Sequence, residues 1–173
     1  KKEGKIRYYG IALGPGPGGL EEGRAAMRKY DLGSIQTYYN ILEEEPGRKF
    51  FPVALEIAQG MVIRAPHAGG VLESDPNAVQ FPADGDLQVK DSAWVDRSRK
   101  QAIHLGWIYE GKGMTLSQAA IKFILSEETV ASVIPNIYRE EHLAEYGAVS
   151  DFESFTQVEL GEIAEQFRRG FGV

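Results

Sequence analysis

Four short runs of apolar and aromatic residues recur along the chain, at residues 6–13, 34–40, 61–65 and 130–135. Each run is followed by a segment with helical character. Strands that alternate with helices in this way are typical of crossover units, whose strands are parallel. The pattern therefore predicts four β-α units and one parallel sheet. Because the first run is apolar at successive positions, we expect its strand to be buried on both faces.

The spacing of apolar residues predicts helices at 20–30, 47–59, 96–109, 116–127 and 138–149, and a final helix at about 156–169. Capping boxes at Thr115 with Gln118 and at Thr156 with Glu159 mark two helix starts. Gly60 stands where a glycine commonly ends a helix. Residues from about 69 to 95 form a long loop, and loops of this length are usually functional or disordered.

Four β-α units are half of an eight-stranded barrel. The predicted fold class is therefore α/β, with one domain over residues 1–173 that forms half of a (β/α)8 TIM-type barrel. A half-barrel leaves two strand edges unpaired and one face of its sheet uncovered. We therefore expect completion by self-association, in a homodimer that pairs the first strand of one copy with the fourth strand of the other, or in a domain-swapped variant.

The composition is that of an ordinary globular protein, with 43% hydrophobic and 25% charged residues. A net charge of −6 argues against nonspecific nucleic-acid binding, and no apolar run approaches the roughly 18 residues that span a membrane. No secretory signal is visible, which fits a cytoplasmic location. The lack of cysteine excludes disulfides and thiolate metal sites within the chain. Since the sequence begins at Lys1 without Met, we expect a processed product, a trimmed version or a fragment.

A glycine-rich turn follows the first strand, and Gly14, Gly16 and Gly19 fit the pattern G-x-G-x-x-G. Such a turn can cradle a pyrophosphate at a helix N-terminus. Two variable positions are proline, however, and each removes an N–H donor, which favours a purely structural turn. The acidic run at residues 43–45 is predicted to be an exposed loop.

Metal binding is not predicted. His67, His104 and His142 lack ligand spacing. The acidic residues between 84 and 91 fall short of a calcium loop, so a solvated turn is favoured.

Two polar side chains lie within predicted strands. Arg64 ends the third strand, where barrel enzymes place ligand-binding groups. A buried arginine needs an anionic partner, and either an internal salt bridge or a ligand would supply one. Gln36 lies inside the second strand, where a buried amide also needs partners.

The chain resembles the C-terminal half of the aldo-keto reductases over nearly its whole length. The segments that carry the resemblance are KKEGKIRYYG, SIQTYYN, GMVIRAPHAGGVL, DRSR, LSQAAIKFILSEETVASVIPN and EEHLAEY, in this order. The resemblance implies a half-barrel that binds NADP(H) across the C-terminal ends of its strands. The catalytic Asp, Tyr, Lys and His of that family belong to the first half, so the resemblance implies that this chain lacks the catalytic tetrad.

The positions that the resemblance assigns to the cofactor are Gln36, Arg64, Asn136, Arg139, His142, Glu145 and Tyr146. Gln36 matches the glutamine that binds the nicotinamide carboxamide, and Arg64 replaces the aromatic residue on which the nicotinamide stacks. Two departures precede the helices: Ala12-Leu13 replaces a Ser-Asn pair, and Asn136 replaces a basic residue.

The remaining positions concern the adenosine end of the cofactor. His142 stands where an arginine often binds the ribose 2′-phosphate, and Arg139 would replace the lost charge. Glu145 matches a glutamate that faces the adenine, and Tyr146 replaces its asparagine neighbour.

Two functional hypotheses follow. In the first, the chain is the NADP(H)-binding half of an aldo-keto reductase and is active only with a complementary N-terminal half-barrel. In the second, it is a non-catalytic, self-associating scaffold that binds no cofactor.

Overall fold

The computed structural model spans residues 1–173 and describes residues 1–14, 19–74 and 90–173. Most of the glycine-rich turn and most of the long loop predicted at 69–95 therefore lie outside the described residues, as do two of the acidic residues considered for calcium, Asp84 and Asp86.

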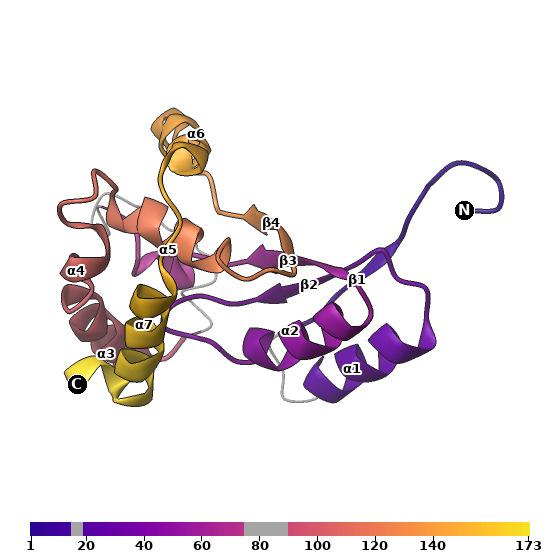
Figure 1. Ribbon diagram of the computed structural model, residues 1–173, viewed down its shortest axis with the longest axis horizontal. Coiled ribbons are helices and arrows are strands. Elements are labelled where there is room, and N and C mark those ends of the chain that lie inside the picture. The colour runs from indigo at the N-terminus through magenta and orange to yellow at the C-terminus, as the bar shows by residue number, and fades with distance from the viewer. Residues whose placement is uncertain (15–18, 75–89) are drawn as a thin grey trace.

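The centre of the molecule is a four-stranded parallel sheet (Figure 1). Its strands are β1 (Gly10–Ala12), β2 (Ser34–Tyr38), β3 (Gly60–Arg64) and β4 (Val130–Ile134), arranged in the order β1-β2-β3-β4. Every neighbouring pair is parallel, and the pairing places Tyr38, Arg64 and Ile134 side by side at one end. The four predicted β-α units and their parallel sheet are confirmed.

The first strand differs from the prediction in length and in burial. Pairing with β2 begins at Gly10, and the side chains of Ile6 and Tyr8 are 50% and 73% exposed. The expectation of a strand at 6–13 buried on both faces is wrong. β1 is an edge strand with one neighbour in the described sheet, and the apolar residues that precede it pair with no strand there and stay largely exposed.

Seven helices are described. They are α1 (Gly19–Lys29), α2 (Gly47–Glu56), α3 (Ser92–Ile103), α4 (Gly106–Tyr109), α5 (Leu116–Ile124), α6 (Glu140–Gly147) and α7 (Gln157–Arg168). Helices α1 and α2 lie together along one side of the sheet, and α3, α4 and α7 gather beyond its C-terminal ends (Figure 1). The final helix lies where the sequence predicts it.

Several helix ends differ from the prediction. Helix α2 stops at Glu56 because the chain turns at Ala58, whose φ of 52° is left-handed, and Gly60 begins β3 instead of ending the helix. The segment predicted as one helix at 96–109 is two helices that break at His104 and Leu105. Helix α3 starts early because the Asp91 carboxylate accepts a hydrogen bond from the Trp94 N–H at 2.7 Å.

Helices α5 and α6 are both shorter than predicted. The two predicted capping boxes are present, one at the start of α5 and one at the start of α7. The side chain of Thr115 accepts from the Gln118 N–H, and that of Thr156 accepts from the Glu159 N–H. These bonds satisfy N–H groups that have no partner within a helix.

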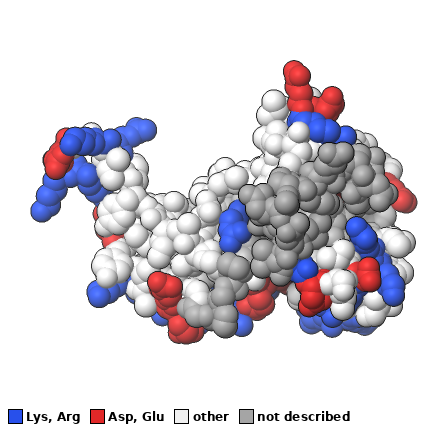
Figure 2. All heavy atoms as spheres, turned by 180° about the vertical axis from the view of Figure 1, so that it is seen from behind, with Lys and Arg blue, Asp and Glu red and all other residues white. Residues whose placement is uncertain are grey.

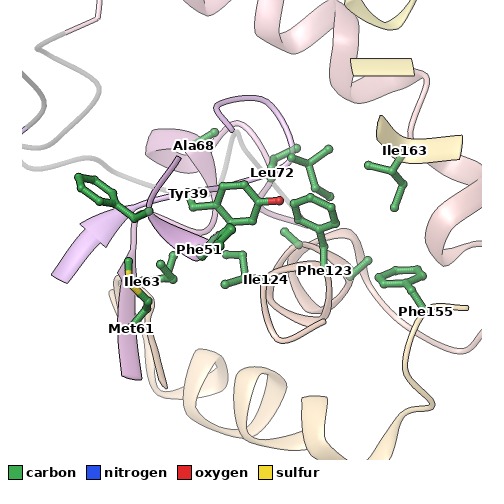
Figure 3. Close-up of a cluster of buried hydrophobic side chains, with 14 of the residues drawn as sticks. Tyr39, Phe51, Met61, Ile63, Ala68, Leu72, Phe123, Ile124, Phe155 and Ile163 are labelled. Atoms are coloured by element: carbon green, nitrogen blue, oxygen red, sulfur yellow. The ribbon is translucent and has the colours of Figure 1, made fainter. Parts of the chain in front are cut away.

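The core lies between the sheet and the helices and is centred on Tyr39 (Figure 3). The ring of Tyr39 meets Phe51 edge-on at 4.9 Å and stacks on Phe123 at 5.4 Å. Its buried hydroxyl donates to the Glu127 carboxylate at 3.0 Å, so this polar group is satisfied.

The two faces of the sheet differ in burial. Ile35, Thr37, Met61 and Ile63 are completely buried on the helix side. Their neighbours along the strands are half-buried or exposed and form the opposite surface, which we call the open face: Gly10, Ala12, Ser34, Gln36, Tyr38, Gly60, Val62, Arg64, Ser132 and Ile134. An uncovered face is what a half-barrel predicts.

Candidate functional site

Polar groups gather where the parallel strands end, because the carboxyl ends of such strands share one edge of the sheet. Gln36 and Tyr38 come from β2, Arg64 from β3, and Lys90 from the segment before α3. We call these four residues the strand-end site. Figure 2 shows a basic side chain in the middle of the rear face of the molecule, away from the basic N-terminal arm.

Arg64 reaches across the open face. Its Nη2 lies 3.4 Å from the carbonyl oxygen of Leu13, beyond the end of β1, and its guanidinium carbon lies 5.8 Å from the centre of the Tyr38 ring. Among the residues that the structure describes, no carboxylate lies within ion-pair distance of Arg64. The geometry therefore gives no support to an internal salt bridge and leaves most of its five N–H donors available.

Gln36 lies one layer further from the strand ends. It is paired in register with Ala12 and Val62, which offer no polar side chain. Within the described part of the chain its side-chain amide makes no hydrogen bond, while its backbone carbonyl accepts from the Leu13 N–H at 2.9 Å. The amide is half-buried and makes no hydrogen bond to the described residues, so it is available to a ligand that offers both a donor and an acceptor.

Lys90 is a site residue that the sequence did not reveal. Its ammonium pairs with the Glu43 carboxylate and lies 4.5 Å from the centre of the Trp94 ring and 5.9 Å from that of Tyr38. Burial, followed by the charge of Glu43, raises the pKa of Tyr38, so its phenol stays neutral at physiological pH. No sequence motif connects Lys90 with β2, because the contact depends on the path of the intervening chain.

The acidic run at 43–45 is not the exposed loop that the sequence predicts. Glu44 is buried and pairs with the Arg48 guanidinium one turn later, in α2. Glu43 accepts from the Asn40 amide at 3.2 Å as well as from Lys90. Glu45 pairs with Lys49 at 3.2 Å, so all three carboxylates are held by basic partners.

The candidates after β4 fall into exposed and buried positions. Asn136 and Arg139 are exposed, whereas His142 in α6 is only 1% exposed. The Arg139 guanidinium donates to His142 Nε2 at 3.1 Å, and the imidazole packs against the Tyr146 ring at a tilt, with 5.0 Å between the ring centres. His142 therefore fixes Arg139 from the buried side and is not itself accessible to a phosphate.

Tyr146 also points inward. Its hydroxyl donates to the Glu73 carboxylate at 2.7 Å, and Glu73 lies 3.0 Å from His67 Nδ1 and accepts from Ser117 Oγ at 3.3 Å. We call His67, Glu73, Ser117 and Tyr146 the Glu73 cluster. Burial alone would raise the pKa of Glu73, but the hydrogen bonds from His67 and Tyr146 outweigh it and hold this pKa below its usual value. Burial, followed by the hydrogen bond to Glu73, raises the pKa of Tyr146.

Glu145 lies beside a cavity of about 550 Å³ between the loop after β3, α3 and the start of α5. Its Oε1 accepts from Ser74 Oγ at 2.8 Å and from Thr115 Oγ1 at 2.6 Å, and both hydroxyl-bearing residues line that cavity. The seven predicted residues thus form two groups, one on the open face and one around α6.

The described residues offer neither a membrane-spanning helix nor a cluster of metal ligands. No helix among residues 1–14, 19–74 and 90–173 is both long and apolar enough to cross a membrane. In the same part of the chain, no three His, Cys, Asp or Glu side chains are grouped as metal ligands.

Comparisons with known proteins agree on one family. The model of the aldo/keto reductase family matches residues 1–166. The uncharacterized oxidoreductase YqkF of Bacillus subtilis (strain 168) is 24% identical over 162 residues, which are 92% of this chain and 50% of that protein.

Solved structures share the fold. The aldo-keto reductase AKR11C1 from Bacillus halodurans, in its holo form, is 23% identical with a TM-score of 0.70, and the match covers 95% of this chain and 51% of that one. The glycerol dehydrogenase AKR11B4 from Gluconobacter oxydans is 17% identical with a TM-score of 0.73, over 98% and 51% of the two chains. The chain spans about half the length of these relatives, so its four β-α units are half of a (β/α)8 barrel, and it belongs to the aldo/keto reductase family.

Proposed function

We propose that this chain is the NADP(H)-binding half of an aldo-keto reductase barrel. The observation that carries the proposal is the side-chain amide of Gln36 on the open face, which makes no hydrogen bond to any residue that the structure describes. A nicotinamide carboxamide offers a donor and an acceptor that match the two sides of this amide. The fold places Gln36 near the carboxyl ends of the strands, where α/β barrels bind their ligands.

Different residues would contact the two ends of the cofactor. Gln36 and Arg64 would hold the nicotinamide end, and the exposed Asn136 and Arg139 would meet the adenosine end. When bound, the cofactor supplies the hydride for reduction of a carbonyl group. His142 and Tyr146 support this site from within α6, which departs from the direct contacts expected of them.

The complete reaction requires a second half-barrel. Relatives described as a reductase and as a glycerol dehydrogenase are about twice as long as this chain. In the proposal, the complementary half supplies the proton donor for the carbonyl oxygen and covers the open face, whether it belongs to a longer form of this polypeptide or to another one.

Titration of the 173-residue chain with NADPH, and with NADH for comparison, tests the proposal. Trp94 lies beside Lys90 and reports on the site by fluorescence, together with the nicotinamide signal. We expect saturable binding that Gln36→Ala weakens by roughly 10-fold, through loss of hydrogen bonds to the carboxamide. The exposed Gln157→Ala is the matched control and should leave binding unchanged. Absence of binding at millimolar cofactor would refute the proposal.

A second function, a self-associating scaffold without cofactor, is favoured by a different observation. The open face and the β4 edge expose apolar surface, with Ile134 46% exposed. A homodimer that closes the barrel would cover this surface and pair both edges. A dimer that forms equally well with and without NADPH, and that binds no cofactor, would favour this function over the first.

A further inference from the structure

One buried side chain joins the ends of β2 and β3. Asn40 is completely buried and lies two residues after Tyr38, where β2 ends. Its Oδ1 accepts from the Leu42 and Glu43 N–H groups at 3.0 Å and 2.9 Å. Its Nδ2 donates to the carbonyl oxygen of Ala65 at 3.1 Å and to the Glu43 carboxylate at 3.2 Å. The amide thus makes all four hydrogen bonds that an asparagine side chain can make.

The bond to Ala65 supports an unusual backbone conformation. Ala65 follows Arg64 directly, and its φ of 55° is left-handed, which is unfavourable for a residue with a Cβ. Such a residue keeps this conformation only where its surroundings hold it. The carbonyl oxygen of Ala65 accepts from Asn40 and from the Ala68 N–H at 3.2 Å. Asn40 therefore helps to fix the turn that ends β3, and with it the direction in which Arg64 leaves the strand.

The bond to Glu43 leads to the other basic side chain of the strand-end site. One carboxylate oxygen of Glu43 accepts from Asn40, and the other pairs with the Lys90 ammonium. Lys90 in turn lies over the Trp94 ring, 4.5 Å from its centre. Asn40 is thus joined to the contacts that place both Arg64 and Lys90, while its own side chain is too deeply buried to touch a ligand.

We propose that Asn40 is a positioning residue for the strand-end site. Through Ala65 it fixes Arg64 on the open face. Through Glu43 it fixes Lys90 at the edge of that face. The inference rests on the proposed function, in which Arg64 meets the nicotinamide end of the cofactor.

The test replaces Asn40 by Ser. A serine hydroxyl can still accept from the N–H groups of the local turn, but it is too short to reach Ala65 or Glu43. The variant therefore removes the two donated bonds and keeps the turn after β2. Asn40→Asp keeps the size of the side chain and also loses both donors, so it carries the same expectation if the serine variant fails to fold.

The first measurement needs no ligand. In the ¹⁵N-labelled chain, the Nε–H resonance of Arg64 and the indole N–H resonance of Trp94 report on the two contacts. The indole N–H of Trp107, which donates to Gln166, lies outside the site. We expect Asn40→Ser to shift the Arg64 and Trp94 resonances and to leave that of Trp107 unchanged. The matched control is Gln157→Ser, which replaces an exposed amide on α7 and should shift none of the three.

Two further variants separate the contacts. Glu43→Gln breaks the ion pair with Lys90 and should shift the Trp94 resonance alone, because the amide oxygen can still accept from Asn40. The double variant Asn40→Ser/Ala65→Gly should recover the Arg64 resonance but not that of Trp94. Glycine adopts a positive φ without the Cβ penalty, so the turn at position 65 then no longer depends on Asn40.

With cofactor, the inference predicts a split between the two ends of the site. Asn40→Ser should weaken NADPH binding roughly 10-fold, because Arg64 is displaced, and should leave the binding of adenosine 2′,5′-bisphosphate unchanged. This nucleotide carries only the adenosine end, which Asn136 and Arg139 would meet. A purely structural role of Asn40 would weaken both ligands alike.

Three outcomes would each overturn the inference: unshifted Arg64 and Trp94 resonances in Asn40→Ser, a shift that extends to Trp107, or equal weakening of the two nucleotides. Failure of the proposed function gives a different result. The unchanged chain then binds no NADPH, while the resonances of the ligand-free chain still decide the role of Asn40.

Discussion

At the scale of single residues, Glu73 holds the segment after β3 to two helices. Only 3% of its surface is exposed, and its carboxylate receives contacts from His67, from Ser117 in α5 and from Tyr146 in α6. A buried carboxylate is stable only while such partners are present. Glu73 therefore helps to hold α6, and with it Arg139, in position.

Replacement of Glu73 by Gln should lower the free energy of unfolding by about 3 kcal/mol, because the buried cluster loses the carboxylate that lies 3.0 Å from His67 Nδ1, while the amide oxygen still accepts from Tyr146. Urea denaturation measures the change. The exposed Glu153→Gln serves as control and should fall within about 0.5 kcal/mol of the unchanged chain. Equal stability of the two variants would contradict a structural role for the Glu73 cluster.

The difference in stability between the unchanged chain and Glu73→Gln should depend on pH. The pKa of Glu73 in the folded state lies below its ordinary value of 4.5, so its stabilising contribution is complete above pH 4.5 and is lost as the pH falls through the lower, folded-state pKa. The difference in unfolding free energy between the unchanged chain and Glu73→Gln should therefore narrow in acid, when measured from neutral pH down to about pH 3. A difference that stays constant would show that Glu73 does not titrate in this way.

At the scale of elements, the two capping boxes offer a comparison. Thr156→Ala removes an exposed cap from α7 and should cost about 1 kcal/mol. Thr115→Ala should cost about 2 kcal/mol, because the half-buried Thr115 hydroxyl also donates to Glu145 and so joins α5 to α6. Thermal or urea unfolding of both variants measures the difference, and the Thr→Ser changes at both sites keep the hydroxyl as controls. Equal losses at the two sites would contradict the added role of Thr115.

Element types were predictable from the sequence, and their ends were less so. Periodicity identified the strands and most helices because it records which face is buried. It did not reveal the left-handed turn at Ala58, where glycine is the usual residue, nor the helix start before Trp94, which depends on the side chain of Asp91. Both are local backbone events that the apolar pattern does not encode.

The candidate site was predictable to a similar extent. Gln36 and Arg64 were both predicted as cofactor positions, and strand alternation with the β2–β3 register places them on the same face. The inward direction of His142 and Tyr146 was not predictable, since it depends on Glu73, which lies about 70 residues earlier in the chain and carries no motif. Long-range polar pairing of this kind becomes visible only in three dimensions.

At the scale of the whole molecule, the open face is the feature that requires completion. It carries small, polar and aromatic side chains from all four strands, and the strand-end site lies at its edge. Exposure of its apolar side chains to water is unfavourable in free energy. A complementary half-barrel or a second copy of the chain would cover them. The cofactor and scaffold hypotheses differ in which of the two covers it.

The self-association hypothesis gives a prediction at this scale. Ile134 lies on the open face of β4, in register with Arg64, and a homodimer that closes the barrel would bury it. Light scattering over a range of concentrations should show a mass of two chains for the unchanged protein and of one chain for Ile134→Lys, whose charge would be buried without a partner. Ile103→Lys is the matched control, because Ile103 on α3 is 78% exposed and lies outside the open face, and it should still dimerise. A monomer at all concentrations would exclude the homodimer, and the open face would then belong to a complementary half-barrel.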